Sequence, residues 1–128
     1  MAYDEAVRSV TVVAGSAIAV YRLIALAADG EFDYVGTAGL MPDGVSLEAA
    51  SGQGKVLGMG LPDGSIVKVV AGAAFSRGDN LMSNNAGKAI AFTNVAGQVS
   101  CGKAMAAAAA DGDVVSVLFK PVTQYYAS

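Results

Sequence analysis

Glycine-centred turns divide this 128-residue chain into short segments, and their spacing constrains the fold more than any other feature. Glycine contributes 16 residues, well above the average share of about 7%. Turn signals about 14 to 25 residues apart suit short strands better than helices. These signals are Asp29-Gly30, Asp43-Gly44, Asp63-Gly64, Ala86-Gly87 and Asp111-Gly112.

The segments between these turns are rich in β-branched residues. Many are dense in valine instead of alternating cleanly, as expected for strands that are covered on both faces. The composition of 17–26 would also allow a buried helix. The segments that we predict as strands are 7–13, part of 17–26, 32–35, 56–61, 66–70, 89–95, 99–105 and 114–119. The sequence therefore predicts an all-β fold of about eight short strands, with short helical turns only.

The chain also aligns with itself. Residues 44–61 fall without a gap on 102–119, and 14–18 fall on 71–75. In this alignment the five alanines at 106–110 become the second copy of a connection that reads LEAASGQG in the first copy. A single helical turn on the surface is the alternative interpretation of the run. About half of the chain is too short to bury its apolar faces alone, so an internal duplication predicts a compact β-sandwich or barrel.

This pattern gives a simple domain organisation. We expect an N-terminal arm and first strand at 1–13, and a single β domain at 14–119 that contains pseudo-repeats 14–61 and 71–119. Residues 120–128 are expected to form a C-terminal tail, because Pro121 cannot donate to a ladder in the middle of a sheet.

Composition excludes several classes of protein. Only 15% of residues are charged, against about 25% on average, and mean hydropathy is +0.50. Either burial in an assembly or a bias toward tiny residues accounts for the low charged fraction and the high mean hydropathy. Net charge is −3 and the cations are scattered singly, which argues against nucleic acid. The longest apolar stretch, 17–28, is interrupted by Arg22 and is too short to span a membrane.

No constellation of residues suggests catalysis. The chain has no histidine, and its one cysteine, Cys101, is expected to be a buried small hydrophobe. We find no signal-peptide pattern, so synthesis in a reducing host cytoplasm is expected. The carboxylates at 29–33 and 111–113 lack the spacing of a glycosidase pair or a calcium loop, and the glycines at 52–58 lack phosphate-loop spacing. We therefore predict no enzyme activity, no cofactor and no metal.

Two stretches of the chain, AGAAFSRGDNLMSNNAGKAIAF and GQVSCGKAMAAAAADGDVVSVLF, share a pattern of small residues and turn glycines. On this pattern the chain resembles the capsid cement (decoration) proteins of tailed bacteriophages, and the similarity covers about residues 14–119. In the first copy Tyr21-Arg22 stands where the second has Gly78-Asp79, which predicts different turns. The matching positions are Ala71, Gly72, Ala74, Gly78, Asp79, Leu81, Gly87, Lys88, Gly102, Ala104, Gly112, Asp113, Val115 and Val117.

The resemblance implies a structural virion protein on the capsid exterior. Such a protein binds the outer surface of the capsid, commonly as a homotrimer, and stabilises contacts between major capsid protein subunits. Because exposed aromatic residues and arginine are common interface anchors, we expect contacts from the chain ends. The residues in question are Tyr3, Val7, Arg8, Tyr125 and Tyr126. The alternative is another virion-surface binding module, for instance one that recognises a host glycan.

Overall fold

The computed structural model describes residues 8–93 and 95–122, and this part of the chain is all-β and contains no helix. Ten strands follow one another along this part of the chain, and turns or bends separate most of them. They are β1 (Ser9–Val13), β2 (Leu23–Leu26), β3 (Phe32–Tyr34), β4 (Gly44–Ser46), β5 (Val56–Gly60), β6 (Ile66–Val70), β7 (Asn80–Ser83), β8 (Ala89–Ala91), β9 (Ser100–Ala104) and β10 (Val114–Val122).

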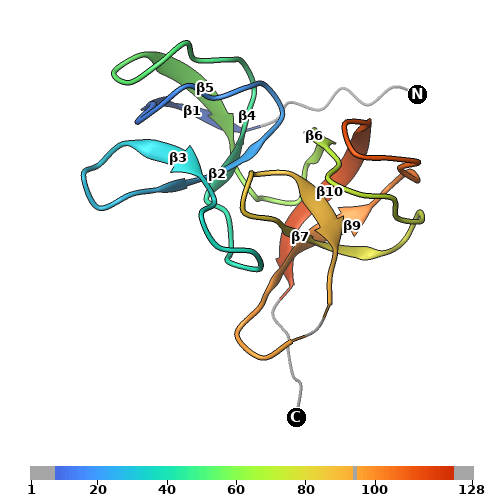
Figure 1. The fold of residues 1–128 in the computed structure, drawn as a ribbon. Helices are drawn as coiled ribbons and strands as arrows, with labels where there is room; N and C mark the ends of the chain where they lie inside the picture. Colours follow the sequence, from blue (N-terminus) through green and yellow to red (C-terminus); the bar gives the residue numbers. More distant parts are fainter. Residues whose placement is uncertain (1–7, 94, 123–128) are drawn as a thin grey trace.

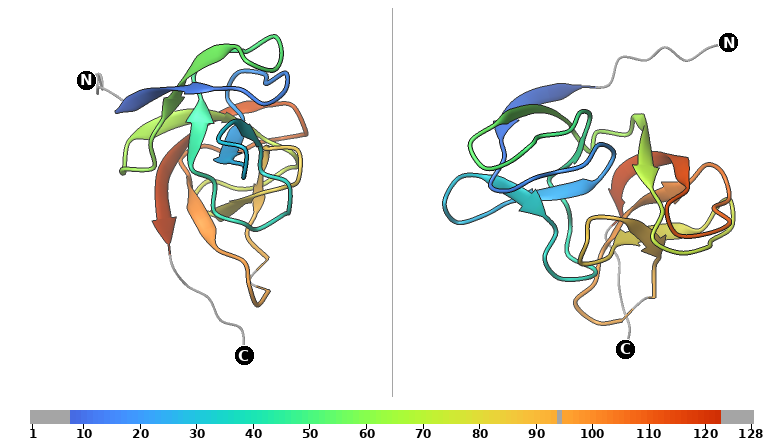
Figure 2. Two further views of the ribbon diagram at one scale, coloured as in Figure 1. Left: turned by 90° about the vertical axis from the view of Figure 1, so that its left-hand side faces the viewer. Right: turned by 45° about the horizontal axis from the view of Figure 1, so that its top comes forward.

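The strands form two five-stranded antiparallel sheets, one from each half of the chain. The first sheet has the order β1-β5-β4-β2-β3, and the second has the order β6-β10-β9-β7-β8. Adding five to each strand number of the first sheet gives the order of the second sheet, so the two halves share one topology. The sheets lie side by side in a sandwich-like arrangement, blue to green and yellow to red (Figures 1 and 2). The predicted fold class and the internal duplication are therefore confirmed.

Isolated bridges repeat at equivalent positions in the two halves. In each half, the residue that follows the first strand makes a parallel bridge to the third strand, so the two outer strands of each sheet touch at one point. A second, antiparallel bridge holds the small-residue connection of each repeat. The bridges are Ala14–Phe32 and Ile18–Ala50 in the first repeat, and Ala71–Ala89 and Phe75–Ala108 in the second.

The run of five alanines forms the connection between β9 and β10. Ala108 is buried in this connection, where its N–H donates to the Phe75 carbonyl (3.0 Å) and its carbonyl accepts from the Phe75 N–H (3.1 Å). The run then ends in a turn at Gly112, whose φ is +99°. No helical turn forms at 106–110. Alanine is used here for its small size next to a neighbouring backbone, and not for its helix propensity.

The turn before β2 differs from the sequence-based expectation. Tyr21 adopts a φ of +65°, and its counterpart Gly78 adopts +91°. The Tyr21 N–H donates to the Ser46 carbonyl, and the Gly78 N–H donates to the Ala104 carbonyl, each at 2.8 Å. The same left-handed turn is therefore made twice, although a tyrosine rarely adopts this conformation.

The sequence analysis did not predict β4 and β7, and β10 is longer than the predicted strand. β4 and β7 have only three and four residues, and polar or glycine residues make up much of each. The β10 backbone continues past Pro121 to Val122, where its pairing with β9 shifts register after Phe119. Proline is tolerated there because an irregular ladder does not require every N–H to donate.

The two repeats share a core. The larger cluster of buried residues comes mainly from the second repeat, around Phe75, Leu81 and Phe119. Leu23 and Val45 of the first repeat belong to this cluster, with exposed fractions of 1% and 0%. The smaller cluster lies inside the first repeat: Ala14, Ile18, Ile24, Ala50, Leu57 and Met59. Burial of first-repeat side chains against the second repeat therefore joins the two halves into one folded body.

Gly102 in β9 provides a direct test of this packing. A Cβ atom at Gly102 would clash with the Leu118 carbonyl oxygen of the neighbouring strand, whereas one at Gly52 would meet nothing within 4 Å. We expect Gly102→Ala to lower the free energy of unfolding by about 2–3 kcal/mol, because backbone cannot move aside cheaply. Gly52→Ala should change it by less than about 0.5 kcal/mol. Urea denaturation of both variants checks this, and equal losses would contradict the close strand contact.

Candidate functional site

Arg8 is the one predicted capsid-contact residue that lies within the described part of the chain. Tyr3, Val7, Tyr125 and Tyr126 fall outside the described residues. The Arg8 side chain is 72% exposed, and its Nε lies 3.7 Å from Oδ2 of Asp63. Its carbonyl accepts from the Leu61 N–H (2.9 Å), so Arg8 lies next to the linker between the repeats. The contact roles of all five residues stay predictions.

The partner of Arg8 is held by its own turn. Asp63 Oδ1 accepts from the Ser65 hydroxyl (2.7 Å) and from the Ser65 N–H (3.2 Å). The hydrogen bond from the Ser65 hydroxyl is the main cause that lowers the pKa of the Asp63 carboxyl, and the Arg8 charge adds a smaller effect. An exposed ion pair of this length contributes little to stability, so Arg8 remains accessible to a partner.

Aliphatic side chains are exposed on the outer face of the first sheet. Val13 of β1 and Val56 of β5 lie directly opposite each other across the strand pair. Their exposed fractions are 37% and 63%. Thr11 pairs with Gly58 on the same face, and the exposed Glu48 carboxylate borders it, because Oε2 of Glu48 accepts from the Gly58 N–H at 2.7 Å. In the second sheet the equivalent of Val56 is Val114, which is 50% exposed. Such surfaces suit repeated protein contacts.

The outer face of the second sheet is basic. We call it the lysine face, and define it by the exposed side chains of Lys68 (β6), Lys103 (β9) and Lys120 (β10) together with the half-buried Ile66 and Leu118. Strand register places these side chains together, because Leu118 pairs with both Ile66 and Lys103. Gly102, Lys103, Leu118 and Lys120 line a shallow hollow of about 230 Å³.

Sequence analysis missed the lysine face because its lysines are far apart in the chain. The signal was present in each strand. Lys68 stands between buried Val67 and Val69, and Lys103 between buried Gly102 and Ala104. This alternation marks an outward-facing position. Only the order of the strands in the sheet, which the sequence does not reveal, brings these positions together.

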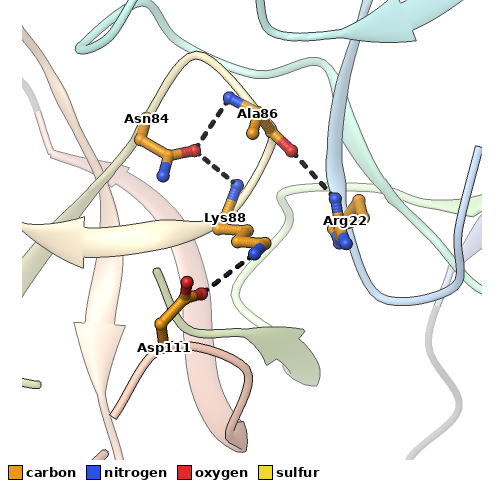
Figure 3. Close-up of polar contacts among 5 residues, drawn as sticks. All are labelled: Arg22, Asn84, Ala86, Lys88 and Asp111. Atoms are coloured by element: carbon orange, nitrogen blue, oxygen red, sulfur yellow. Dashed lines mark hydrogen bonds and ion pairs between the residues drawn. The ribbon is translucent and has the colours of Figure 1, made fainter. Parts of the chain in front are cut away.

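A polar network holds the junction between the repeats (Figure 3). Arg22 Nη1 donates to the Ala86 carbonyl (3.1 Å), and the Arg22 guanidinium carbon lies 5.2 Å from the centre of the Tyr34 ring. Asn84 Oδ1 accepts from the N–H groups of Ala86 and Lys88, both at 2.9 Å, which fixes the turn that presents this carbonyl. Arg22 therefore joins a first-repeat aromatic ring to a second-repeat turn.

Gly87 allows the backbones to meet at this junction. The Leu23 N–H donates to the Gly87 carbonyl at 2.7 Å. A Cβ atom on Gly87 would lie 2.7 Å from the Leu23 carbonyl oxygen and 3.0 Å from the Tyr34 ring, and Gly87 has a φ of +74°. Its counterpart Gly30 has a φ of +88° with nothing within 4 Å. Both glycines make the same turn, but only Gly87 is also required for close contact.

The carboxylates considered as catalytic or calcium-binding candidates stabilise turns. Asp33 Oδ1 accepts from the Ser16 hydroxyl (2.7 Å), and Asp113 Oδ2 accepts from the Ala109 N–H (2.8 Å). Asp111 pairs with Lys88 Nζ at 2.9 Å, as Figure 3 shows. Within residues 8–93 and 95–122, no three His, Cys, Asp or Glu side chains gather where a metal could bind. The same residues contain no helix able to cross a membrane.

Cys101 is buried inside the second repeat, with 1% of its surface exposed. Loss of hydration at this position raises the pKa of the Cys101 thiol to about 12. The thiolate is the reactive form of cysteine, so at neutral pH this side chain is chemically inert and serves as packing.

Comparison with known proteins identifies a structural neighbour. No known protein-family model matches the sequence, and no curated protein sequence matches it. Among solved structures, the chain is similar to the head fiber gp8.5 N base of bacteriophage phi29, with a TM-score of 0.71 and 23% sequence identity. The match covers 93% of this chain and 100% of that chain. At this identity the likeness shows a common fold.

Gly87 and Gly30 together test the junction. Both are in left-handed turns, so alanine at either position adds conformational strain of about 1 kcal/mol. Only Gly87→Ala also forces Leu23 and Tyr34 apart, so we expect it to lower the free energy of unfolding by at least about 2 kcal/mol more than Gly30→Ala does. Chemical denaturation measures both values. Equal effects would show that the backbone contact does not hold the repeats together.

Cys101 should resist thiol reagents in the folded protein. We expect an aromatic disulfide reagent to react with it only after denaturant is added, and the native reaction to stay slow up to about pH 9, because the thiolate remains a minor species there. Lys55→Cys, at an exposed position, should give one thiol that reacts at once. Rapid labelling of native Cys101 would contradict its burial.

Proposed function

We propose that this chain is a structural component of a tailed-bacteriophage virion, without catalytic activity, that binds the outer surface of the capsid. In this role it acts as a cement or decoration protein and stabilises contacts between neighbouring major capsid protein subunits. The observation that carries the proposal is the shared fold with a phage head fiber base over nearly the whole chain. The resemblance of the sequence to capsid cement proteins supports the same class of function.

The extent of the match strengthens the proposal. The neighbour is covered over its full length by this chain, so the similarity includes both five-stranded sheets and their mutual packing. A single sheet of five short strands could recur in unrelated proteins by chance. A tandem pair with the same overall arrangement is a more specific likeness, and it supports a place on a phage head.

The surface of the molecule also suits the proposal. Aliphatic residues such as Val13 and Val56 are exposed on the sheet, and charged residues are only 15% of the chain. A protein present in many copies can bind firmly through modest contacts of this kind, because a trimer engages several capsid subunits at once. The proposal includes a homotrimer in which Arg8, Tyr3, Val7, Tyr125 and Tyr126 make capsid contacts.

A second candidate is an anchor for a longer virion-surface structure. The solved neighbour is described as the base of a head fiber, and this favours a module that attaches to the head without strengthening it. The two functions differ in one measurable property. A cement protein raises the stability of the capsid shell, whereas an anchor binds and leaves the stability of the shell unchanged.

Co-sedimentation with capsids tests the proposed function. We expect the purified protein to bind expanded capsids that lack it, to saturate at a fixed number of copies per capsid, and to raise the temperature at which the capsid disrupts. Deletion of residues 1–5 should weaken binding if the N-terminal arm contributes. A protein that does not sediment with capsids would contradict the proposal, and saturable binding without stabilisation would favour the anchor function.

A further inference from the structure

The two repeats use the same sheet face in different ways. In the first repeat, Leu23 pairs with Val45, and Val45 pairs with Gly60. In the second repeat, the equivalent ladder is Asn80, Lys103 and Leu118, with the same pairing. Leu23 and Val45 are buried against the second repeat, whereas Asn80 and Lys103 are exposed. The part of the face that contacts the other repeat in the first sheet is therefore accessible in the second sheet.

The accessible face carries one sign of charge. The strands of the second sheet contain Lys68, Lys103 and Lys120 but no aspartate or glutamate, although the whole chain has a net charge of −3. None of these lysines forms an ion pair with another described residue. In the first sheet the only charged strand residue is Asp33. The cations are thus concentrated on one face, where their fields add.

From these observations we propose that the lysine face is a docking surface for an acidic protein patch, and that this patch belongs to the capsid lattice. The second statement rests on the proposed function. Three cations around a half-buried Ile66 and Leu118 give a charged rim with an aliphatic centre, which is the usual composition of a protein interface. The hollow beside Lys103 and Leu118 offers room for a partner side chain.

A nucleic acid is the less suitable occupant. Affinity for DNA comes largely from Lys and Arg contacts to phosphates, and this face offers only three lysines within a chain of net charge −3. Its centre is aliphatic, and the strands that form it have no exposed aromatic residue on which a base could stack. Charge complementarity with a protein surface, supported by a small apolar contact, accounts better for this combination of residues.

A matched pair of charge reversals tests the proposal. Lys103→Glu alters the lysine face, and Lys55→Glu makes the same change in charge at an exposed position in the first repeat. We expect Lys103→Glu to weaken capsid binding by roughly tenfold and to reduce its dependence on salt, while Lys55→Glu leaves both unchanged. Lys68→Glu combined with Lys103→Glu should weaken binding further. Unchanged urea midpoints would establish that all three variants are folded.

The outcomes separate this proposal from the proposed function. If the wild-type protein binds capsids and Lys103→Glu binds equally well, the lysine face is not the docking surface, although the capsid-binding function stands. If the wild-type protein binds duplex DNA and Lys103→Glu does not, the partner is a nucleic acid and the proposal is wrong. If light scattering shows that Lys103→Glu lowers the mass of the free protein, the face contacts a second copy, and the assignment to the capsid is overturned.

Discussion

The contact between the two repeats is the interaction on which the rest of the structure depends. Leu23 and Val45 extend from the first sheet into the main core of the second repeat, and Arg22 reaches the Ala86 carbonyl beside them. Backbone hydrogen bonds also cross this boundary, among them Leu23 N–H to the Gly87 carbonyl, Val70 N–H to the Tyr21 carbonyl and Gly39 N–H to the Ser83 carbonyl. Each half alone has about sixty residues, which is close to the lower limit for burying a stable core. The junction lets two marginal units share one interior.

Duplication also explains why the molecule has an unequal surface. The two halves repeat their strand order, their isolated bridges and even the left-handed turn at Tyr21 and Gly78. A tandem pair has only one internal junction, so the part of the face around Leu23 and Val45 is buried in the first repeat, while the equivalent part around Asn80 and Lys103 remains exposed in the second. The residues at equivalent positions of this face differ accordingly. Val45 in the first repeat is apolar, and its equivalent in the second repeat, Lys103, is charged. The lysine face is thus a consequence of having two repeats and a single junction.

Much of the fold could be predicted from local signals, and the site could not. Turn glycines such as Gly112 predicted where strands end, and valine-rich segments such as that of β10 predicted the strands themselves. The spacing of small residues revealed the duplication. β4 and β7 were missed because three or four residues carry too little pattern. The Arg22–Ala86 contact joins residues 64 positions apart, and the lysine face gathers residues from three strands. Both arise from the packing of sheets and strands, which local sequence patterns do not encode.

Scanning calorimetry of the full chain tests most directly whether the shared core makes the two repeats one unit. If Leu23 and Val45 complete the interior of the second repeat, neither half can unfold without exposing the other, and the protein should show a single transition. The calorimetric enthalpy should then equal the van't Hoff enthalpy. Two separate transitions, or a calorimetric enthalpy about twice the van't Hoff value, would show that the repeats fold independently and would contradict the account.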